Sequence, residues 1–340
     1  MSDPSGTATR VPNDEFLPRK RGFGESMALE LRKSGRAWLL VTPVLIALVV
    51  VIGYPVARAL WMSFQKDQGL DPSTGMFVEG GNAGFSNYTH WLLQQCQAGG
   101  ETVSCPTGNL GSQFWTAIGV TLFFTVVTVA LEAGIGLSMA MVMGKTFRGR
   151  ALLRAAVLIP WAIPTAVTAR LWEFMFQYDG VVNRVFGTHI LWTSDEWPSR
   201  FAVIAADVWK TTPFMALLLL AGLQVIPADV YEAAKVDGAT AWQRFTQITL
   251  PLLKPALLVA VLFRTMDALR MYDLPAIMTL GNPSTRTVSI LVVDQVRQGP
   301  NSAAALSTLT FLLIFAIAFV LVKVLGANAV RTQEDQREAH

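Results

Sequence analysis

The residues of this sequence best placed to bind or pair are charged side chains inside an otherwise apolar segment. Four of them alternate in sign at three-residue spacing: Arg264, Asp267, Arg270 and Asp273. If the segment is a helix within a bilayer, each charge costs about 2.5 to 3.5 kcal/mol at the helix centre, so the side chains must be paired or hydrated. Spacing of i, i+3 lets them neutralise one another along one helix. A water-filled cavity around them is the alternative, and the sequence supports the two about equally.

No catalytic or metal-binding constellation accompanies these charges. The three histidines, His90, His189 and His340, are scattered and supply too few ligands for a metal site. The sequence contains neither a nucleophile elbow nor the phosphate-binding pattern G-x-x-x-x-G-K-[ST]. We therefore expect no catalytic residue, no metal and no cofactor in this chain.

Composition indicates a membrane protein. Apolar residues make up 52% of the 340 residues and charged residues 15%, with a mean hydropathy of +0.42. A bilayer-spanning helix needs about 20 mostly apolar residues, and six segments qualify: 37–57, 114–144, 151–176, 201–225, 255–280 and 303–322. The predicted fold class is all-α, a polytopic membrane protein with six transmembrane helices. The net charge of +3 is spread in small groups and gives no reason to expect nucleic acid.

The distribution of Lys and Arg predicts the orientation. Basic residues gather in the amino-terminal segment, in the loop near 145–154, in a polar insert and near the carboxyl terminus, whereas the longest loop has few. By the positive-inside rule, both termini and the insert are cytoplasmic. The expected divisions are 1–36, a disordered basic tail with a short helix; 37–325, the transmembrane domain, whose first span acts as an uncleaved anchor; 58–113, an external loop; 226–251, the insert; and 326–340, a second cytoplasmic tail.

Both cysteines, Cys96 and Cys105, lie in the long external loop. A disulfide is permitted outside the cell membrane, and the short separation in sequence can close. Two cysteines fix no pattern, however. A structural disulfide and two free thiols therefore stay equally open.

The polar insert predicts a helix-turn-helix. Pro227 suits a helix start and Gly238 suits the position just after a helix end, so residues 228–237 form one short helix. Ala241, Phe245 and Ile248 then recur at helical spacing, and Pro251 ends this second helix. Small side chains on the first helix would let another surface approach closely. Docking into a groove of a partner is favoured over resting on lipid headgroups, because the helix lacks a run of large apolar residues.

The insert resembles the signature of a known family, the permease subunits of ATP-binding-cassette (ABC) importers. Its cytoplasmic loop carries E-A-A, then Gly, then I-x-L-P, matched here by Glu232-Ala233-Ala234, Gly238 and Ile248-Thr249-Leu250-Pro251. Further stretches are similar to the carbohydrate-importing branch: Trp209-Lys210-Thr211-Thr212-Pro213, Pro160-Trp161-Ala162-Ile163-Pro164, Tyr272-Asp273 and Gly281-Asn282-Pro283. Asn282 stands where that branch often has a second glycine. The resemblance covers most of the chain, from about Trp38 to Val324.

The resemblance implies a heteromeric importer in a bacterial cell membrane. Its other parts would be a second, non-identical permease subunit, two cytoplasmic ATPases that hold ATP and Mg, and an external substrate-binding protein. The substrate would be a sugar, a di- or oligosaccharide, with glycerophosphodiester-like and polyol substrates as alternatives. Residues implied in coupling to the ATPase are Tyr231, Glu232, Ala233, Ala234, Asp237, Gly238, Phe245 and Pro251. Residues that would line the sugar pathway are Arg264, Asp267, Arg270, Asp273, Lys210, Thr211 and Asn282.

Other charges and other classes of protein were weighed against this interpretation. Glu132, Arg170 and Glu173 are expected to form pairs between helices rather than to bind substrate. A secondary transporter driven by an ion gradient would also carry charges in its spans, but it gives no account of the insert. A membrane-embedded enzyme would need a catalytic cluster, which the sequence does not show.

Overall fold

The computed structural model describes residues 38–70, 75–98 and 101–338, so the tail expected at 1–36 lies outside the described residues. The chain divides into two compact units, Met1–Arg58 and Ala59–His340. A first helix runs over Trp38–Met62, long and apolar enough to cross a bilayer. It contains a π-helical segment, η1 (Val49–Gly53), and ends as α2 (Tyr54–Met62).

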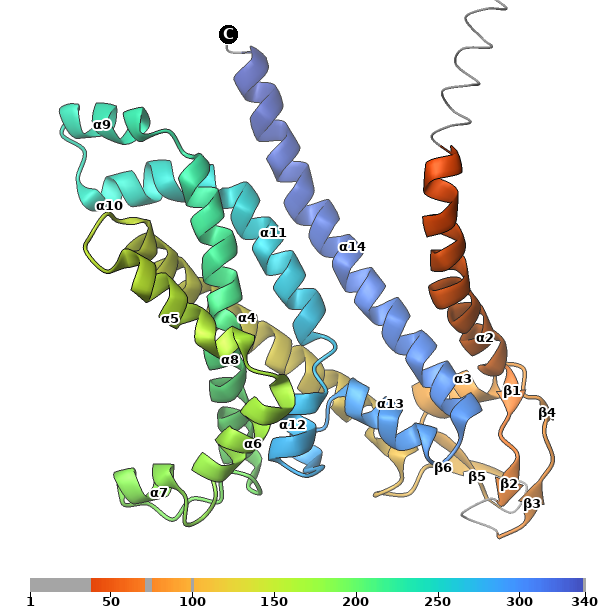
Figure 1. The fold of residues 1–340 in the computed structure, drawn as a ribbon. Helices are drawn as coiled ribbons and strands as arrows, with labels where there is room; N and C mark the ends of the chain where they lie inside the picture. Colours follow the sequence, from red (N-terminus) through yellow and green to blue (C-terminus); the bar gives the residue numbers. More distant parts are fainter. Residues whose placement is uncertain (1–37, 71–74, 99–100, 339–340) are drawn as a thin grey trace, which may run out of the picture. The chain divides into compact units, whose positions relative to one another are not determined.

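Four long helices dominate the second unit. They are α4 (Phe114–Gly144), α8 (Glu196–Val225), α11 (Leu250–Ala268) and α14 (Pro300–Glu338). Helices α4 and α8 pack along each other, and α11 packs against both (Figure 1). In the described chain, five helices are long and apolar enough to span a membrane, or six if one bent pair counts as a span. The protein is therefore a polytopic all-α membrane protein, as its hydropathy predicts.

A bent pair of helices forms the third predicted span, 151–176. Helix α5 (Arg150–Ala162) and helix α6 (Thr165–Met175) meet at 90°. Ile163, between them, has φ −74° and ψ 132°, outside the helical region. A residue that precedes proline is pushed to extended geometry, and Pro164 follows directly.

The fifth predicted span is also interrupted. Helix α11 ends at Ala268, and a short helix, α12 (Asp273–Met278), follows after a turn. Pro275 is the residue in this span most expected to break a helix, but it sits inside α12, and the break lies ahead of it. Helix α12 packs against α6, so the two interrupted spans meet.

The cytoplasmic and external segments predicted by the sequence lie at opposite ends of this unit (Figure 1). One end carries α9 (Ala228–Val236), α10 (Ala241–Arg244) and the π-helical η3 (Phe245–Thr249). The other carries α7 (Val181–Phe186), α12, η4 (Pro283–Thr285) and α13 (Val288–Val296).

Small hairpins build the external loop at that second end. Strand β1 (Gln65–Lys66) pairs with β4 (Gly81–Asn82), β2 (Gly69–Leu70) with β3 (Phe77–Val78), and β5 (Gln95–Ala98) with β6 (Glu101–Ser104), all antiparallel. Helix α3 (Ser86–Leu92) and the 3-10 helix η2 (Leu110–Gln113) complete the loop. The fully buried Trp91 ties it to the membrane helices, since its indole N–H donates to the Ser302 carbonyl at 3.1 Å.

Candidate functional site

The turn of the insert has the backbone geometry that its glycine predicts. Gly238 has φ +79°, in the left-handed region that favours glycine. The amide of Gly238 donates to the Lys235 carbonyl at 3.1 Å, and that of Ala239 donates to the Ala234 carbonyl at 2.9 Å. These bonds satisfy carbonyls that the end of α9 would otherwise leave free. A Cβ at Gly238 would meet no atom within 4 Å. Glycine is therefore favoured here by the backbone conformation and not by a lack of space for a side chain.

Side chains then fix the second part of the insert. Thr240 and Gln243 form a capping box at the start of α10. Arg244 donates to the Ala239 carbonyl at 2.6 Å, and the hydroxyl of Tyr231 shares a hydrogen bond with that of Thr249 at 3.1 Å. The two arms of the insert are thus held together across the turn, and we call residues 226–251 the coupling loop from here on.

The coupling loop exposes only part of the motif. Glu232, Ala233 and Asp237 are exposed, whereas Ala234 is buried and Tyr231 is half-buried. Ala233 is therefore open to the approach of another surface, whereas Ala234 is covered by the protein itself. Two apolar side chains that the motif does not include are more exposed, with Val236 at 87% and Trp242 at 70%. The half-buried Phe245 stacks beside Trp242 with ring centroids 5.6 Å apart.

Pro251 does not end a helix, contrary to the sequence prediction. The helical backbone continues from α10 through η3 into α11, with Pro251 in the first turn of α11. A proline interferes with the carbonyl four residues earlier, here Gln247. Gln247 lies in the π-helical segment, whose hydrogen bonds span five residues instead of four. The coupling loop is therefore continuous with the membrane helix α11, which bends where it begins (Figure 1).

A network of buried charges links three helices in the middle of the bundle. Arg264 of α11 forms salt bridges with Glu132 of α4 and Asp207 of α8. It also pairs with Asp267 on its own helix at 2.6 Å. The side chains of Arg264, Glu132 and Asp207 are 2%, 0% and 9% exposed. We call Glu132, Asp207 and Arg264 the charge network.

Two residues next to Asp207 on α8 extend these contacts. The hydroxyl of Thr211 donates to Glu132 at 2.7 Å. The ammonium of Lys210 donates to the carbonyl of Ile163 at 2.5 Å, at the bend between α5 and α6. Lys210, Thr211 and Arg264, which are predicted to line a pathway because they are polar residues inside the spans, bond to protein groups in this conformation.

Sequence reasoning missed Asp207. The signal was present: an acidic residue inside the predicted span 201–225, one helical turn before Lys210. The expected interhelical pairing of Glu132 is what the structure shows. The same expectation is wrong for Arg170 and Glu173, which pair with each other at 2.7 Å within α6.

The remaining members of the alternating series are exposed. The side chain of Asp267 is 69% exposed, and Arg270 and Asp273 are exposed as well. Within the described residues, neither Arg270 nor Asp273 forms an ion pair. The pairing along one helix is therefore present for Arg264 and Asp267, and a water-filled cavity around the other two charges stays a prediction. Asn282 instead supports a loop, because its amide donates to the Ser194 carbonyl at 2.7 Å.

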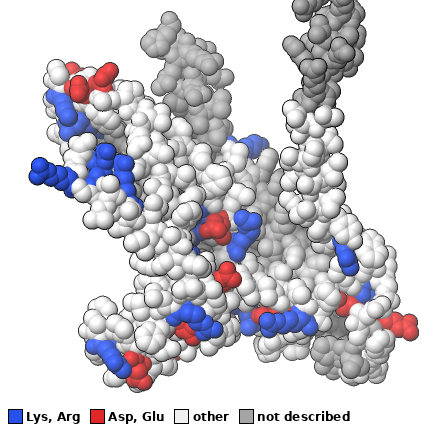
Figure 2. All heavy atoms as spheres, in the orientation of Figure 1, with Lys and Arg blue, Asp and Glu red and all other residues white. Residues whose placement is uncertain are grey.

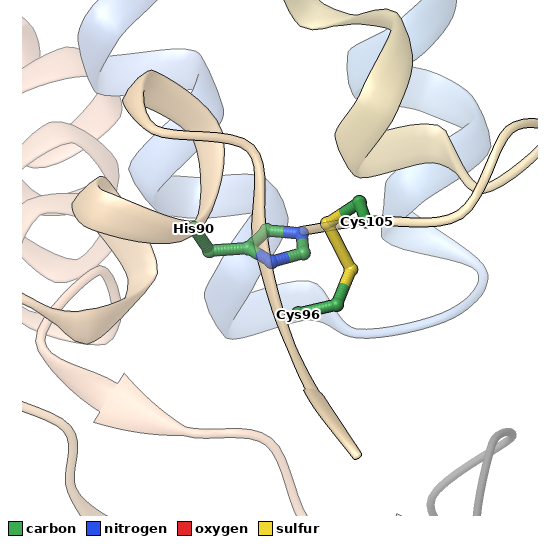
Figure 3. A group of neighbouring side chains, drawn as sticks. All are labelled: His90, Cys96 and Cys105. Carbon is green, nitrogen blue, oxygen red and sulfur yellow. A yellow bond between two sulfur atoms is a disulfide. The ribbon is translucent and has the colours of Figure 1, made fainter. Parts of the chain in front are cut away.

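Cys96 of β5 forms a disulfide with Cys105, the residue that follows β6. His90 points toward this disulfide from α3, and one ring nitrogen and the two sulfurs lie within 4.8 Å of one another (Figure 3). Because each sulfur is bonded to the other, neither is a thiolate that could bind a metal in this state. The Nδ1 of His90 donates to the Gln95 carbonyl at 2.6 Å. Burial lowers the pKa of His90, and this hydrogen bond partly offsets the effect.

Comparison with known proteins decides the family. The sequence model of one protein family, described as binding-protein-dependent transport system inner membrane component, matches residues 132–330. The chain belongs to this family. It is a permease subunit, and thus a multi-pass membrane protein rather than itself an enzyme.

Relatives of this permease support the same assignment. The trehalose/maltose transport system permease protein MalF of Thermococcus litoralis is 40% identical over 304 residues, which cover 87% of this chain and 95% of that protein. The trehalose transport system permease protein SugA of Mycobacterium tuberculosis is 39% identical over 296 residues, covering 86% and 89%. The fold matches a bacterial ABC transporter for alginate import at a TM-score of 0.68 and 19% identity, covering 90% of this chain and 99% of that one.

Proposed function

We infer that this permease forms half of the pathway for a di- or oligosaccharide in an ATP-driven importer. The observation that carries the inference is the coupling loop, a rigid and exposed helix-turn-helix continuous with α11 at one end of the bundle. Relatives of similar length are named as permeases for trehalose/maltose, for trehalose and for sulfoquinovosyl glycerol, all glycosides. A polyhydroxylated solute is therefore the substrate class that we assign.

The partners follow from the family. We propose a second, non-identical permease subunit, two ATPase subunits that bind ATP and Mg, and an external binding protein that delivers the sugar. One solved alginate importer that shares this fold is in complex with a periplasmic protein that holds an alginate pentasaccharide. In this proposal, closure of the ATPases moves the coupling loop. Reversing a two-state equilibrium from 1:99 to 99:1 requires about 5.5 kcal/mol of differential binding, which a loosely attached loop could not transmit.

The docking surface would use the exposed residues of the coupling loop. Glu232, Ala233 and Asp237 of the motif lie beside Val236 and Trp242, which offer apolar area. The role of Tyr231, Gly238 and Phe245 would be indirect. They stabilise the conformation of the loop and do not need to contact the partner. The buried Ala234 and the helix-embedded Pro251 would keep the two arms close together.

The sugar pathway would use the exposed charges that follow Arg264. Carboxylates of Asp267 and Asp273 can accept hydrogen bonds from sugar hydroxyls, and Arg270 can donate them. Asp267 is the best positioned of the three, since Arg264 fixes its carboxylate at 2.6 Å while most of the side chain stays exposed. Charges at this depth are tolerated where they face water or a partner, as a pathway provides.

Orientation is part of the proposal. Figure 2 shows several basic side chains and an acidic group over the end that carries α9 and α10, charges of both signs at the opposite end, and a small mixed group between them. The positive-inside rule places the end with the coupling loop, and both termini, in the cytoplasm. The disulfide then lies outside, where oxidation is favoured.

Uptake into proteoliposomes that contain the purified complex tests the function. We expect a labelled disaccharide to accumulate when ATP is supplied on the side of the coupling loop, and to continue accumulating after an uncoupler collapses the proton gradient. Mass spectrometry of the solute retained by the co-purified binding protein identifies the sugar. Uptake that needs no ATP and follows the ion gradient would establish a secondary transporter instead.

A further inference from the structure

The charge network forms a polar connection between three membrane helices at a single point. Arg264 reaches α4 through Glu132 and α8 through Asp207. Thr211 adds a second bond from α8 to Glu132. Each of the three helices is therefore bonded to the other two through polar side chains that are buried or, at Thr211, half-buried.

Such a connection opposes sliding of the helices in addition to their side-chain packing. Lipid tails are as apolar as the side chains of these helices, so van der Waals packing and polar contacts, rather than a hydrophobic driving force, hold the helices together. Separating Arg264 from Glu132 or Asp207 would leave an uncompensated charge in apolar surroundings. The charge network thus fixes the register of α4, α8 and α11.

The same three helices are packed continuously from the charge network to the coupling loop. Asp207 lies about 27 Å from the end of α8 at Val225, and Arg264 about 21 Å from the start of α11, at 1.5 Å per residue. Buried apolar side chains fill the intervening space, among them Met215, Leu219 and Leu253.

Close backbone approach reinforces this packing near the loop. A Cβ added to Gly222 of α8 would lie 2.4 Å from the Cβ of Ala256 on α11. Real Cβ atoms do not approach so closely, so the two helices touch where Gly222 has no side chain. Movement of one arm of the coupling loop is therefore passed to the other.

The bent third span is attached to the same helix. Lys210, one turn after Asp207, donates to the Ile163 carbonyl at the bend of α5 and α6. The rings of Trp161 and Phe214 stack beside this point, with centroids 5.8 Å apart. Displacement of α8 at the level of the charge network would carry the bend with it.

We propose that Glu132, Asp207 and Arg264 are positioning residues that hold α4, α8 and α11 together as one rigid unit, and we call this arrangement the clamp. The rigid unit acts as a lever, because it transmits movement of the coupling loop to the part of the pathway at the level of the charge network. The proposal rests on the proposed function, because a lever acts only if a partner moves the loop. The charge network touches no substrate in this role. It determines how much solute is moved for each ATP consumed, rather than whether ATP is hydrolysed.

The first test removes the charges without leaving an unpaired one. The triple variant Glu132→Gln, Asp207→Asn, Arg264→Gln is reconstituted as the whole complex, and sugar transported per ATP hydrolysed is measured at equal amounts of assembled protein. We expect this ratio to fall at least about fivefold, the lower end of typical coupling effects, while ATP hydrolysis continues. Leu291→Ala truncates an equally buried side chain of α13, outside α4, α8 and α11. It is the matched control and should change the ratio by less than about twofold, since it removes packing away from the clamped helices. A wild-type ratio in the triple variant, or an equal loss in Leu291→Ala, overturns the clamp.

The second test leaves the charge network intact, so it stands even if the triple variant does not assemble. Spin labels are placed in pairs at the exposed positions Val126, Phe201 and Phe263 of α4, α8 and α11, after each is replaced by cysteine. Distances between labels are compared in nucleotide-free and ATP-trapped complexes. We expect all three distances to stay within about 2 Å, and a change of about 5 Å or more, one helical turn, contradicts the clamp.

The two proposals fail in different ways. If wild-type complex shows no ATP-driven uptake, the proposed function is wrong. If wild-type complex transports sugar with ATP while the label distances change, only the clamp is wrong.

Discussion

Tyr231 of α9 and Thr249 of η3 share a hydrogen bond of 3.1 Å that joins the two arms of the coupling loop. The first arm follows α8 and the second continues into α11, so this bond links the loop to both helices that flank it. In a transporter moved by its partners, stiffness at this place decides how much of the motion is passed on.

Tyr231→Phe removes only the hydroxyl. A hydrogen bond of this kind contributes about 0.5 to 1.5 kcal/mol, so α9 should open about 2- to 10-fold more often. Hydrogen exchange of residues 228–236 in the full complex measures this opening, and sugar uptake should fall in parallel. Unchanged exchange would mean that the capping box and Arg244 hold the loop alone.

Gly238→Val forces a β-branched residue into the left-handed region. The backbone conformation costs about 1 to 2 kcal/mol for a residue other than glycine, so the turn should distort while the protein still inserts in the membrane. Uptake should be lost. Gly238→Asn is the control, because asparagine tolerates this conformation, and it should keep most of the uptake. Equal uptake by both variants would show that the turn is not needed for coupling.

Glu232→Lys reverses a charge on the exposed face of α9 without touching the core. We expect normal expression and insertion but loss of the ATPase from the purified complex. A positive charge in place of a negative one would no longer complement the charges of the partner's surface, and this mismatch opposes binding. Glu232→Gln should lose less. Co-purification of the ATPase at wild-type levels with Glu232→Lys would show that the docking surface does not include Glu232.

Asp267→Asn tests the sugar pathway. The substitution keeps the shape but removes the charge that Arg264 positions. A hydrogen bond to a charged group contributes about 1.5 to 3 kcal/mol, so maximal uptake should fall about 10-fold or more. Sugar binding by the external binding protein should not change. Arg170→Gln, an exposed residue paired within α6, is the control and should transport normally. Normal uptake by Asp267→Asn would remove Asp267 from the pathway.

The external loop should lose stability in acid because of His90. Burial holds its folded pKa below the usual value of 6.5, so below about pH 6.5 the unfolded loop binds a proton that the folded loop does not. The contribution of His90 to stability is therefore full above pH 6.5 and is lost as the pH falls from there toward the folded pKa. Hydrogen exchange of residues 86–98, corrected for the intrinsic effect of pH, should be faster at pH 5 than at pH 7.5. His90→Gln should remove this difference, and persistence of the difference in the variant would assign it to another group.

Local signals in the sequence determined the membrane class, the coupling-loop turn and the family. Hydropathy is additive along a segment, so the spans are visible without any tertiary contact. The left-handed turn at Gly238 is equally local, because it depends on one residue that lacks a side chain.

Only the tertiary structure decided how the helices are interrupted and how their charges are paired. The π-helical turn accommodates Pro251 and lets α10 run into α11, and the fifth span breaks between Ala268 and Asp273. Asp207, Glu132 and Arg264 lie far apart in the sequence, and their pairing depends on which faces of three helices meet. Segment hydropathy carries no information about that meeting, because it averages over all faces of a helix, whereas an ion pair forms between two particular side chains.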